Sequence, residues 1–418
     1  MRHAGFGRQG GAIVVSAVLT VLGCSADSDR DGAVVRDSEG IRIVENAAAR
    51  HPPLEDEAVG ATLLAEIGRG EDPAHRFAAI AGAARLSDGT IAVLDAGAAE
   101  LRLFDQDGHH LATVGGQGDG PEEFGYAAAL AAGPADTLFV WDVGRRAVRV
   151  IGPDGQFLDA VPVPVEEVVP QPFQYGRAGP VGDGTLLVLG IDFSSGAPRA
   201  RIRGRHRLPG LLLRYDPRVG RTDTVAFVTA HENFGVELDG RCCAGLGAPF
   251  GRDLAWAVRG GTVYLVDSGR PEVRRIDRSD GLESIDRLAI RPRPATDDLM
   301  ARWREAYLAD LDEAMRARLE PALARVEAPE VLPVFAAPFG VSADAAGRLW
   351  VQRYRPRRST ASSEFDILDV DGRWIRTVTL PRLERVFQLG DGYILALHRD
   401  ALDVETVRLL PRRDLISR

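Results

Sequence analysis

Aspartate recurs at the same point of several short apolar segments. Asp95, Asp142 and Asp267 each end such a segment, and Asp192 lies at the end of a fourth. Carboxylates that converge from several strands could bind a divalent cation such as calcium or act as general bases. Alternatively, each aspartate holds the turn that follows it, through hydrogen bonds from backbone N–H groups. We favour this structural role because the aspartates occupy equivalent positions of a repeat.

Arginines crowd two segments of this acidic chain. The candidate binding residues in them are Arg201, Arg203, Arg205, His206, Arg355 and Arg357. Guanidinium groups match the geometry of carboxylates and phosphates, so these segments could bind an anionic small molecule or glycan. The alternative is a solvated loop. The stretch RARIRGR also alternates like a strand, whose outward face would then carry the arginines.

Two adjacent cysteines follow later in the chain. Cys242 and Cys243 could form a vicinal disulfide in an oxidising compartment or remain free thiols, and both states stay open. His231 and Glu232 are near in sequence, but the segment offers too few clear ligands for a metal site. The sequence contains no HExxH, EF-hand, Walker or Ser-His-Asp pattern. We therefore predict no catalytic residues and no cofactor.

The elements that must position these residues repeat along the chain. A tight-turn dipeptide followed by alternating apolar residues occurs six times, from DGTIAVLD at Asp88 to DGYILALH at Asp391. One strand-like segment precedes each copy, a second follows it, and a third follows the first five. Four antiparallel strands at this period are typical of a β-propeller. We predict an all-β fold, a six-bladed β-propeller with four-stranded blades.

The sixth repeat ends with the chain before its last strand. The segment TLLAEIG, residues 62–68, occupies a last-strand position in front of the first glycine-rich corner. We predict that this N-terminal strand completes the sixth blade and closes the ring, which also protects the sheet edges. The glycine-rich segment Val114–Phe124 lacks the helix start that a phosphate-binding loop needs. We interpret it as a corner between blades, with Phe124 packed between them.

The segment LDAGAAELRLFDQDGHHLATVGGQGDGPEEF couples a strand ending in Asp, a glycine-rich corner and a Pro-x-x-Phe motif. It resembles the NHL-type six-bladed β-propellers, best over residues 80–151 and 258–290, and is similar to propeller-bearing, uncharacterised bacterial lipoproteins. The resemblance implies a fold and no activity. Some six-bladed propellers are lactonases or lyases with a central divalent cation. By analogy of fold, the resemblance therefore leaves open an alternative, a metal-dependent hydrolase or lyase. Its metal ligands would be Asp95, Asp142, Asp192 and Asp267.

The long segments between strands all fall on one face of the predicted propeller. In one of them, apolar residues recur every four positions from Leu299 to Leu319, which predicts a helical insertion at about 297–327. We expect this helix to lie across the propeller as a partial lid. Loops on a rigid scaffold usually carry binding, so we predict that this face binds a ligand or protein partner.

The N-terminus has the pattern of an export signal. Arg2 and Arg8 precede an apolar run, Ala12–Leu22, that is too short to span a bilayer. Residues 21–24, VLGC, resemble the bacterial lipobox, which implies cleavage before Cys24 and lipid attachment to it. We predict a lipoprotein signal peptide over residues 1–23, a flexible tether over 24–40 and the propeller over 41–418.

Charge narrows the classes of partner. All 51 basic residues are arginine, yet the net charge is −9, which makes the chain a poor non-specific binder of nucleic acid. The sequence thus predicts a non-catalytic, monomeric protein, exported and lipid-anchored at the outer membrane or the periplasmic face of the cell envelope. It would contact the membrane only through its anchor and bind a protein or an anionic ligand on its propeller face.

Overall fold

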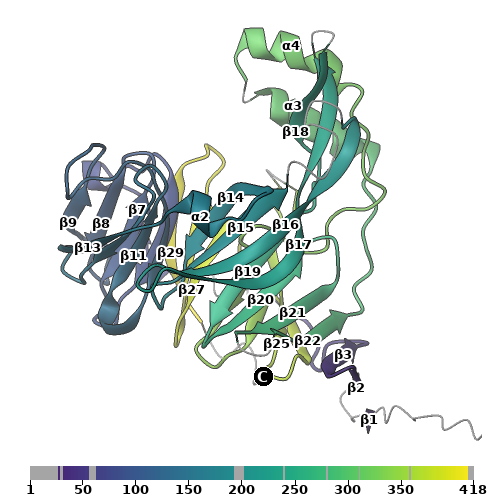
Figure 1. The fold of residues 1–418 in the computed structure, drawn as a ribbon, viewed down its shortest axis with the longest axis horizontal. Coiled ribbons are helices and arrows are strands. Elements are labelled where there is room, and N and C mark those ends of the chain that lie inside the picture. The colour runs from purple at the N-terminus through teal and green to yellow at the C-terminus, as the bar shows by residue number, and fades with distance from the viewer. Residues whose placement is uncertain are drawn as a thin grey trace, which may run out of the picture.

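The computed structural model describes residues 27–28, 32–55, 63–192, 202–238, 241–278, 281–309, 311–356 and 359–412. Within these residues the chain is mostly β, and its strands form six sheets (Figure 1). This confirms the predicted all-β class. Each sheet is built on consecutive antiparallel strands, joined by the tight turns that the sequence indicates.

The first two sheets contain four strands each. They are β6 (Ile80–Arg85), β7 (Ile91–Asp95), β8 (Glu100–Phe104) and β9 (His110–Gly115), then β10 (Ala127–Ala132), β11 (Leu138–Asp142), β12 (Ala147–Ile151) and β13 (Phe157–Pro162). A short helix, α2 (Val165–Val168), leads to the third sheet. That sheet has β14 (Phe173–Pro180), β15 (Leu186–Asp192), β16 (Gly204–Asp216), β17 (Arg221–Leu238) and β18 (Arg241–Gly247).

The remaining three sheets follow in chain order. The fourth is built on β19 (Leu254–Arg259), β20 (Thr262–Asp267), β21 (Glu272–Asp277) and β22 (Gly281–Leu288). The fifth has β23 (Val341–Ala343), β24 (Leu349–Gln352), β25 (Ser363–Leu368) and β26 (Trp374–Leu380). The sixth has β27 (Arg385–Leu389), β28 (Tyr393–Arg399) and β29 (Glu405–Pro411).

The apolar core lies between neighbouring sheets. One cluster joins Leu94 and Leu101 of the first sheet to Leu138 and Val140 of the second, and similar clusters join each later pair. A further cluster packs Leu395 and other residues of the sixth sheet against the first. Strands that are covered on both faces, such as β7, are therefore buried at every residue and apolar up to the aspartate that ends them. Sheets that pack face to face in this succession form a β-propeller.

The glycine-rich corner is structural, as predicted. Gly115 has a φ of +88°, and a Cβ atom there would lie 2.4 Å from the ring of Phe124. Phe124 is fully buried in the cluster between the first and second sheets. The corner therefore needs glycine both for its backbone conformation and for the close approach of this ring.

The N-terminal strands run along the outer edges of the last three sheets. They are β1 (Asp27–Ser28), β2 (Ala33–Ser38), β3 (Ile41–Asn46), β4 (Leu54–Glu55) and β5 (Ala65–Ile67). β3 pairs in parallel with β22, β4 pairs in parallel with β26, and β5 pairs antiparallel with β29. The segment predicted to be a flexible tether therefore contains β2, which pairs with β3 and continues the sheet beyond β22.

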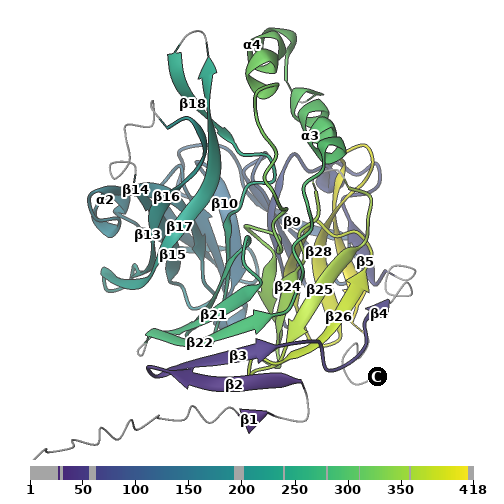
Figure 2. The ribbon, with the colours of Figure 1, turned by 90° about the vertical axis from the view of Figure 1, so that its right-hand side faces the viewer.

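A projecting arm rises from one side of the propeller (Figures 1 and 2). We define it as the distal parts of β16 and β17, with β18, α3 (Asp297–Ala309) and α4 (Glu313–Leu323). The predicted single helix is thus two helices, since the Asp312 side chain caps α4 by accepting from Met315 N at 2.8 Å. The prediction of a lid is wrong. The apolar faces of the helices pack on β17 and Phe250, so the helices project with the third sheet and do not lie across the propeller (Figures 1 and 2).

Candidate functional site

Two of the aspartates singled out by the sequence hold corners of the backbone. The carboxylate of Asp142 is fully buried and accepts hydrogen bonds from the backbone N–H groups of Gly125, Tyr126 and Arg145, at 2.9–3.1 Å. Asp95 is equally buried and accepts from four backbone N–H groups. Each carboxylate therefore joins its own turn to the corner that precedes its sheet, in agreement with the structural role that we favoured.

The four aspartates are not brought together. Asp267 accepts from Gly269 N and from Arg207 Nη1 at 2.7 Å, while Asp192 is buried at the end of β15. Among the described residues, one group of three His, Cys, Asp or Glu side chains is close enough to share a metal ion. It consists of Asp105, Asp107 and His109 in the turn between β8 and β9, and contains none of the four.

The arginines of the long loop pair with acids of the protein itself. Arg205 Nη1 lies 3.0 Å from Glu232 Oε2, and Arg203 lies 3.1 Å from Glu237. The ring of His206 contacts the carbonyl oxygen of Gly204. Arg205 also donates to the carbonyl oxygens of Pro249 and Glu327. These arginines fasten the base of the arm. Arg205 and His206 also line a cavity of about 470 Å³ that contains the carboxylates of Glu232 and Asp267, and the predicted anion site at this loop stays a prediction.

The second arginine segment is also engaged. Arg355 donates to Glu384 at 3.3 Å and to three backbone carbonyl oxygens. Three other predicted residues, Cys24, Arg201 and Arg357, lie outside the described residues. The backbone of Cys242 and Cys243 lies in β18, with Cys242 paired to Glu237, and their side chains are not among those described.

The largest described cavity is the channel between the first strands of the sheets. Its volume is about 800 Å³, and residues of β10, β14, β19, β23 and β27 line it. Contacts between neighbouring first strands give their direction: Arg385 at the start of β27 donates to Ala81 near the start of β6, while Arg259 at the end of β19 donates to Ala345 just beyond β23. Starts therefore lie beside starts and ends beside ends, so the strands run in the same direction.

The charge of this channel is positive. Arg177, Arg259 and Arg385 line it, and the described lining contains no Asp, Glu, His or Cys. Arg177 forms an ion pair, at 3.0 Å, with Asp253, which is not among the residues that line the channel. Arg259 and Arg385 donate to the backbone carbonyl oxygens of Ala345 and Ala81, and no carboxylate of the described residues forms an ion pair with either.

Aromatic rings share the channel with these cations. The guanidinium carbon of Arg385 lies 3.7 Å from the ring centroid of Phe339 and 4.9 Å from that of Phe387. That of Arg177 lies 4.4 Å from the ring centroid of Trp256. Burial lowers the pKa of Arg385 to about 10, so this residue stays charged at neutral pH. The ring faces stabilise the cations in part.

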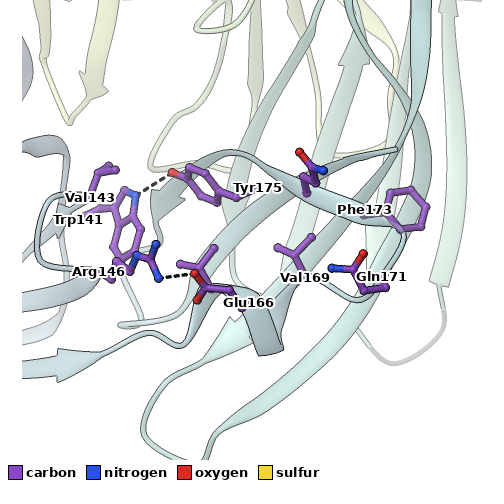
Figure 3. Close-up of a pocket in the computed structure, with 10 residues that line it drawn as sticks. Trp141, Val143, Arg146, Glu166, Val169, Gln171, Phe173 and Tyr175 are labelled. Atoms are coloured by element: carbon purple, nitrogen blue, oxygen red, sulfur yellow. Dashed lines mark hydrogen bonds and ion pairs between the residues drawn. The ribbon is translucent and has the colours of Figure 1, made fainter. Parts of the chain in front are cut away.

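A second cavity of about 360 Å³ opens beside the channel (Figure 3). Tyr175 and Val143 line both cavities. Trp141 Nε1 donates to the Tyr175 hydroxyl at 3.1 Å, and burial raises the pKa of that hydroxyl. Beside Trp141, Arg146 of the turn after β11 pairs with Glu166 of α2 (Figure 3). The two cavities together combine arginine side chains with aromatic surface.

Comparisons with known proteins extend this description only slightly. No family model and no curated protein matches the chain. A solved member of the DUF4221 family from Bacteroides vulgatus is 8% identical, with a TM-score of 0.48 over 83% of this chain and 95% of that chain. Regucalcin from Agrobacterium tumefaciens, a calcium-binding protein, is 12% identical, with a TM-score of 0.39 over 87% and 97%. Virginiamycin B lyase from Staphylococcus aureus is 9% identical, with a TM-score of 0.38 over 80% and 95%. The fold assignment rests on the strand pairing of this chain.

Sequence reasoning missed the channel residues. Arg385 and Phe387 lie two positions apart at the start of the segment RVFQLG, which we recognised only as a strand. Residues two apart share one face of a strand, and the first strand of each repeat lines a propeller's channel. The signal was therefore present as an arginine and an aromatic residue on the inward face of an innermost strand.

Proposed function

We propose that this chain is a non-catalytic binding protein, a six-bladed propeller whose ring is closed by β5. Its ligand binds in the central channel, at the end from which the arm rises. The supporting observation is the channel itself, about 800 Å³ in volume and lined by arginine, aromatic and apolar residues. Concave, largely apolar cavities with a few polar groups are where small molecules usually bind.

The metal-dependent hydrolase or lyase is less well supported. Such an enzyme would need carboxylates or imidazoles at the channel mouth, and the described lining carries neither. Asp95 and Asp142 already accept four and three hydrogen bonds from backbone N–H groups, and a cation would have to compete with these donors. We therefore do not carry this alternative forward as a candidate.

No helix within the described residues has both the length and the apolar character needed to cross a membrane. Because Cys24 follows an export pattern, we propose that the protein is exported and anchored by lipid on this residue. The change Cys24→Ser would then move the protein from the membrane fraction to the soluble fraction of the envelope.

One experiment tests binding against catalysis. The chain from Ser25 onward is screened by thermal shift and native mass spectrometry against a collection of small molecules, and its metal content is measured after dialysis against calcium. We expect a ligand that raises the melting temperature and is recovered unchanged. A stoichiometric metal together with conversion of a lactone or a sugar acid would overturn the proposal, as would the absence of any ligand.

A further inference from the structure

We infer that the channel binds a small organic anion, with its acidic group on the guanidinium of Arg385 and its ring against the neighbouring aromatic side chains. This inference rests on the proposed function and narrows it to one class of ligand. Arg385 is the first residue of β27, so it lies at the end of the channel where the first strands begin.

Arg385 is held in place but not neutralised. Its Nη1 donates to the carbonyl oxygen of Ala81 at 2.7 Å, and its guanidinium carbon lies over the ring of Phe339, 3.7 Å from the ring centroid. A guanidinium group has five N–H donors, so this single described hydrogen bond leaves most of its capacity unused. Arg207 and Arg353, by contrast, lie within 2.9 Å of carboxylate oxygens of Asp267 and Asp366.

An unpaired cation in a partly buried site is costly. Removing a guanidinium group from water loses hydration that two aromatic rings restore only in part. A carboxylate, sulfate or phosphate group would supply both the missing charge and acceptors for a bidentate contact. Arg385 therefore has the environment of a residue whose partner is a ligand.

Aromatic surface lies exposed at the same end. Phe339 is 51% exposed and precedes β23, and Tyr126 is 53% exposed and precedes β10. Since the first strands run in the same direction, both residues lie at the end of the channel that Arg385 occupies. Large exposed aromatic rings in a cavity favour a ligand with a flat aromatic or sugar ring.

The net charge at this end favours one acidic group. Arg177 lies near but is already paired with Asp253, at 3.0 Å. Arg259 is the last residue of β19 and lies at the opposite end of the channel. Among the described residues that line the channel, this leaves Arg385 as the cation available to a ligand at the arm end.

Calorimetry on the chain from Ser25 onward tests the inference. The probes are benzoate and glucuronate, with benzamide and glucose as their neutral counterparts. We expect saturable binding of at least one anion, weakened about tenfold or more by Arg385→Gln because a charge-assisted contact is lost. Arg259→Gln is the matched control, since it removes the same group from the same channel at its other end, and it should change affinity less than about twofold.

Folding and charge are separated by a further variant. Arg385→Lys keeps the cation and should keep the preference for the anion over its neutral counterpart, while melting temperatures establish that each variant is folded. The inference is overturned if no anionic probe binds at millimolar concentration, or if Arg385→Gln and Arg259→Gln have equal effects. It is also overturned if a neutral ligand from the screen binds the channel independently of Arg385, a result that leaves the proposed function standing.

Discussion

At the scale of single residues, the same side chain has two different roles in this protein. Arg205 and Arg207 contact acids and carbonyl oxygens of their own chain, so they act as fasteners between segments. Arg385 contacts one carbonyl oxygen and two rings and faces a cavity. The number of acceptors around each guanidinium group, and not the local density of arginine in the sequence, distinguishes a structural arginine from a candidate binding residue.

The buried aspartates lead to a prediction about stability. Asp142→Ala leaves three backbone N–H groups of a buried corner without an acceptor, and should lower the free energy of unfolding by at least about 2 kcal/mol. Denaturant titration measures the change. Asp154→Ala is the control, since this exposed aspartate of the same sheet accepts one backbone hydrogen bond, from Gln156. Equal losses in the two variants would contradict the role of Asp142.

Glu232 at the base of the arm leads to a prediction about pH. Burial alone would raise its pKa, but hydrogen bonds from Arg252 and the charges of Arg252 and Arg205 hold the pKa below the ordinary value of 4.5. A carboxyl group whose pKa is lower in the folded chain than in the unfolded chain stabilises the fold at pH values above its unfolded pKa. This stabilisation is lost as the pH falls through the folded pKa. The Glu232→Gln variant should therefore be less stable than the unchanged protein at neutral pH. This gap in stability should narrow below about pH 4.5.

Melting temperatures between about pH 7 and pH 3 measure this gap. Glu283→Gln, which removes an exposed carboxylate from β22, is the control and should show little difference at any pH. A gap for Glu232→Gln that stays constant across the whole range would rule out the ionised carboxylate as its source.

At the scale of elements, local sequence was a good guide and distant contacts were not. The turn dipeptides and alternating residues predicted the strands, because both signals depend on neighbouring residues only. The engagement of Arg205 and Arg207 depends on Glu232 and Asp267, which lie 27 and 60 residues away. The channel depends on strands from several repeats. Such partners are brought together only by the packing of several sheets, so the sequence pattern did not reveal them.

The arm is an element with a core of its own. Leu323 of α4 is 1% exposed and packs with Val236 of β17 and Met300 of α3. Leu323→Ala should lower the local stability of the arm by about 2–5 kcal/mol, because it opens a cavity between α4 and β17. We expect faster hydrogen exchange in α3, α4 and the distal part of β17, with exchange unchanged in β6 to β13.

Leu402→Ala is the control for the arm, since Leu402 is 84% exposed in a turn of the sixth sheet. An equal increase in exchange across the first two sheets would show that the arm and the propeller unfold together. That outcome would contradict the separate core, and would make the arm part of the scaffold that positions the channel.

At the scale of the whole molecule, the N-terminal segment connects sheets that are distant in sequence. It adds strands to the outer edges of the fourth and fifth sheets and then supplies β5 to the sixth. Ile67 of β5 is 1% exposed and packs in the cluster that joins the sixth sheet to the first. The sequence pattern predicted β5 but not the outer strands. β3 pairs with the edge of β22, which lies far away in the sequence, so no signal near β3 indicates this pairing.

This arrangement predicts which N-terminal strand matters most. Three shortened chains separate the strands. A chain that begins at Gly32 keeps β2 to β5, one that begins at Leu63 keeps only β5, and one that begins at Gly70 keeps none of them. The first two should melt within a few degrees of each other, because the outer strands cover edges without closing the ring. The chain from Gly70 should have a much lower melting temperature and should aggregate, since it exposes the edge of β29 and the apolar cluster beneath Ile67. Size-exclusion chromatography and thermal melting measure both effects. If the large loss came between Gly32 and Leu63 instead, the outer strands would hold the molecule together, and β5 would be a minor edge of a ring closed by packing alone.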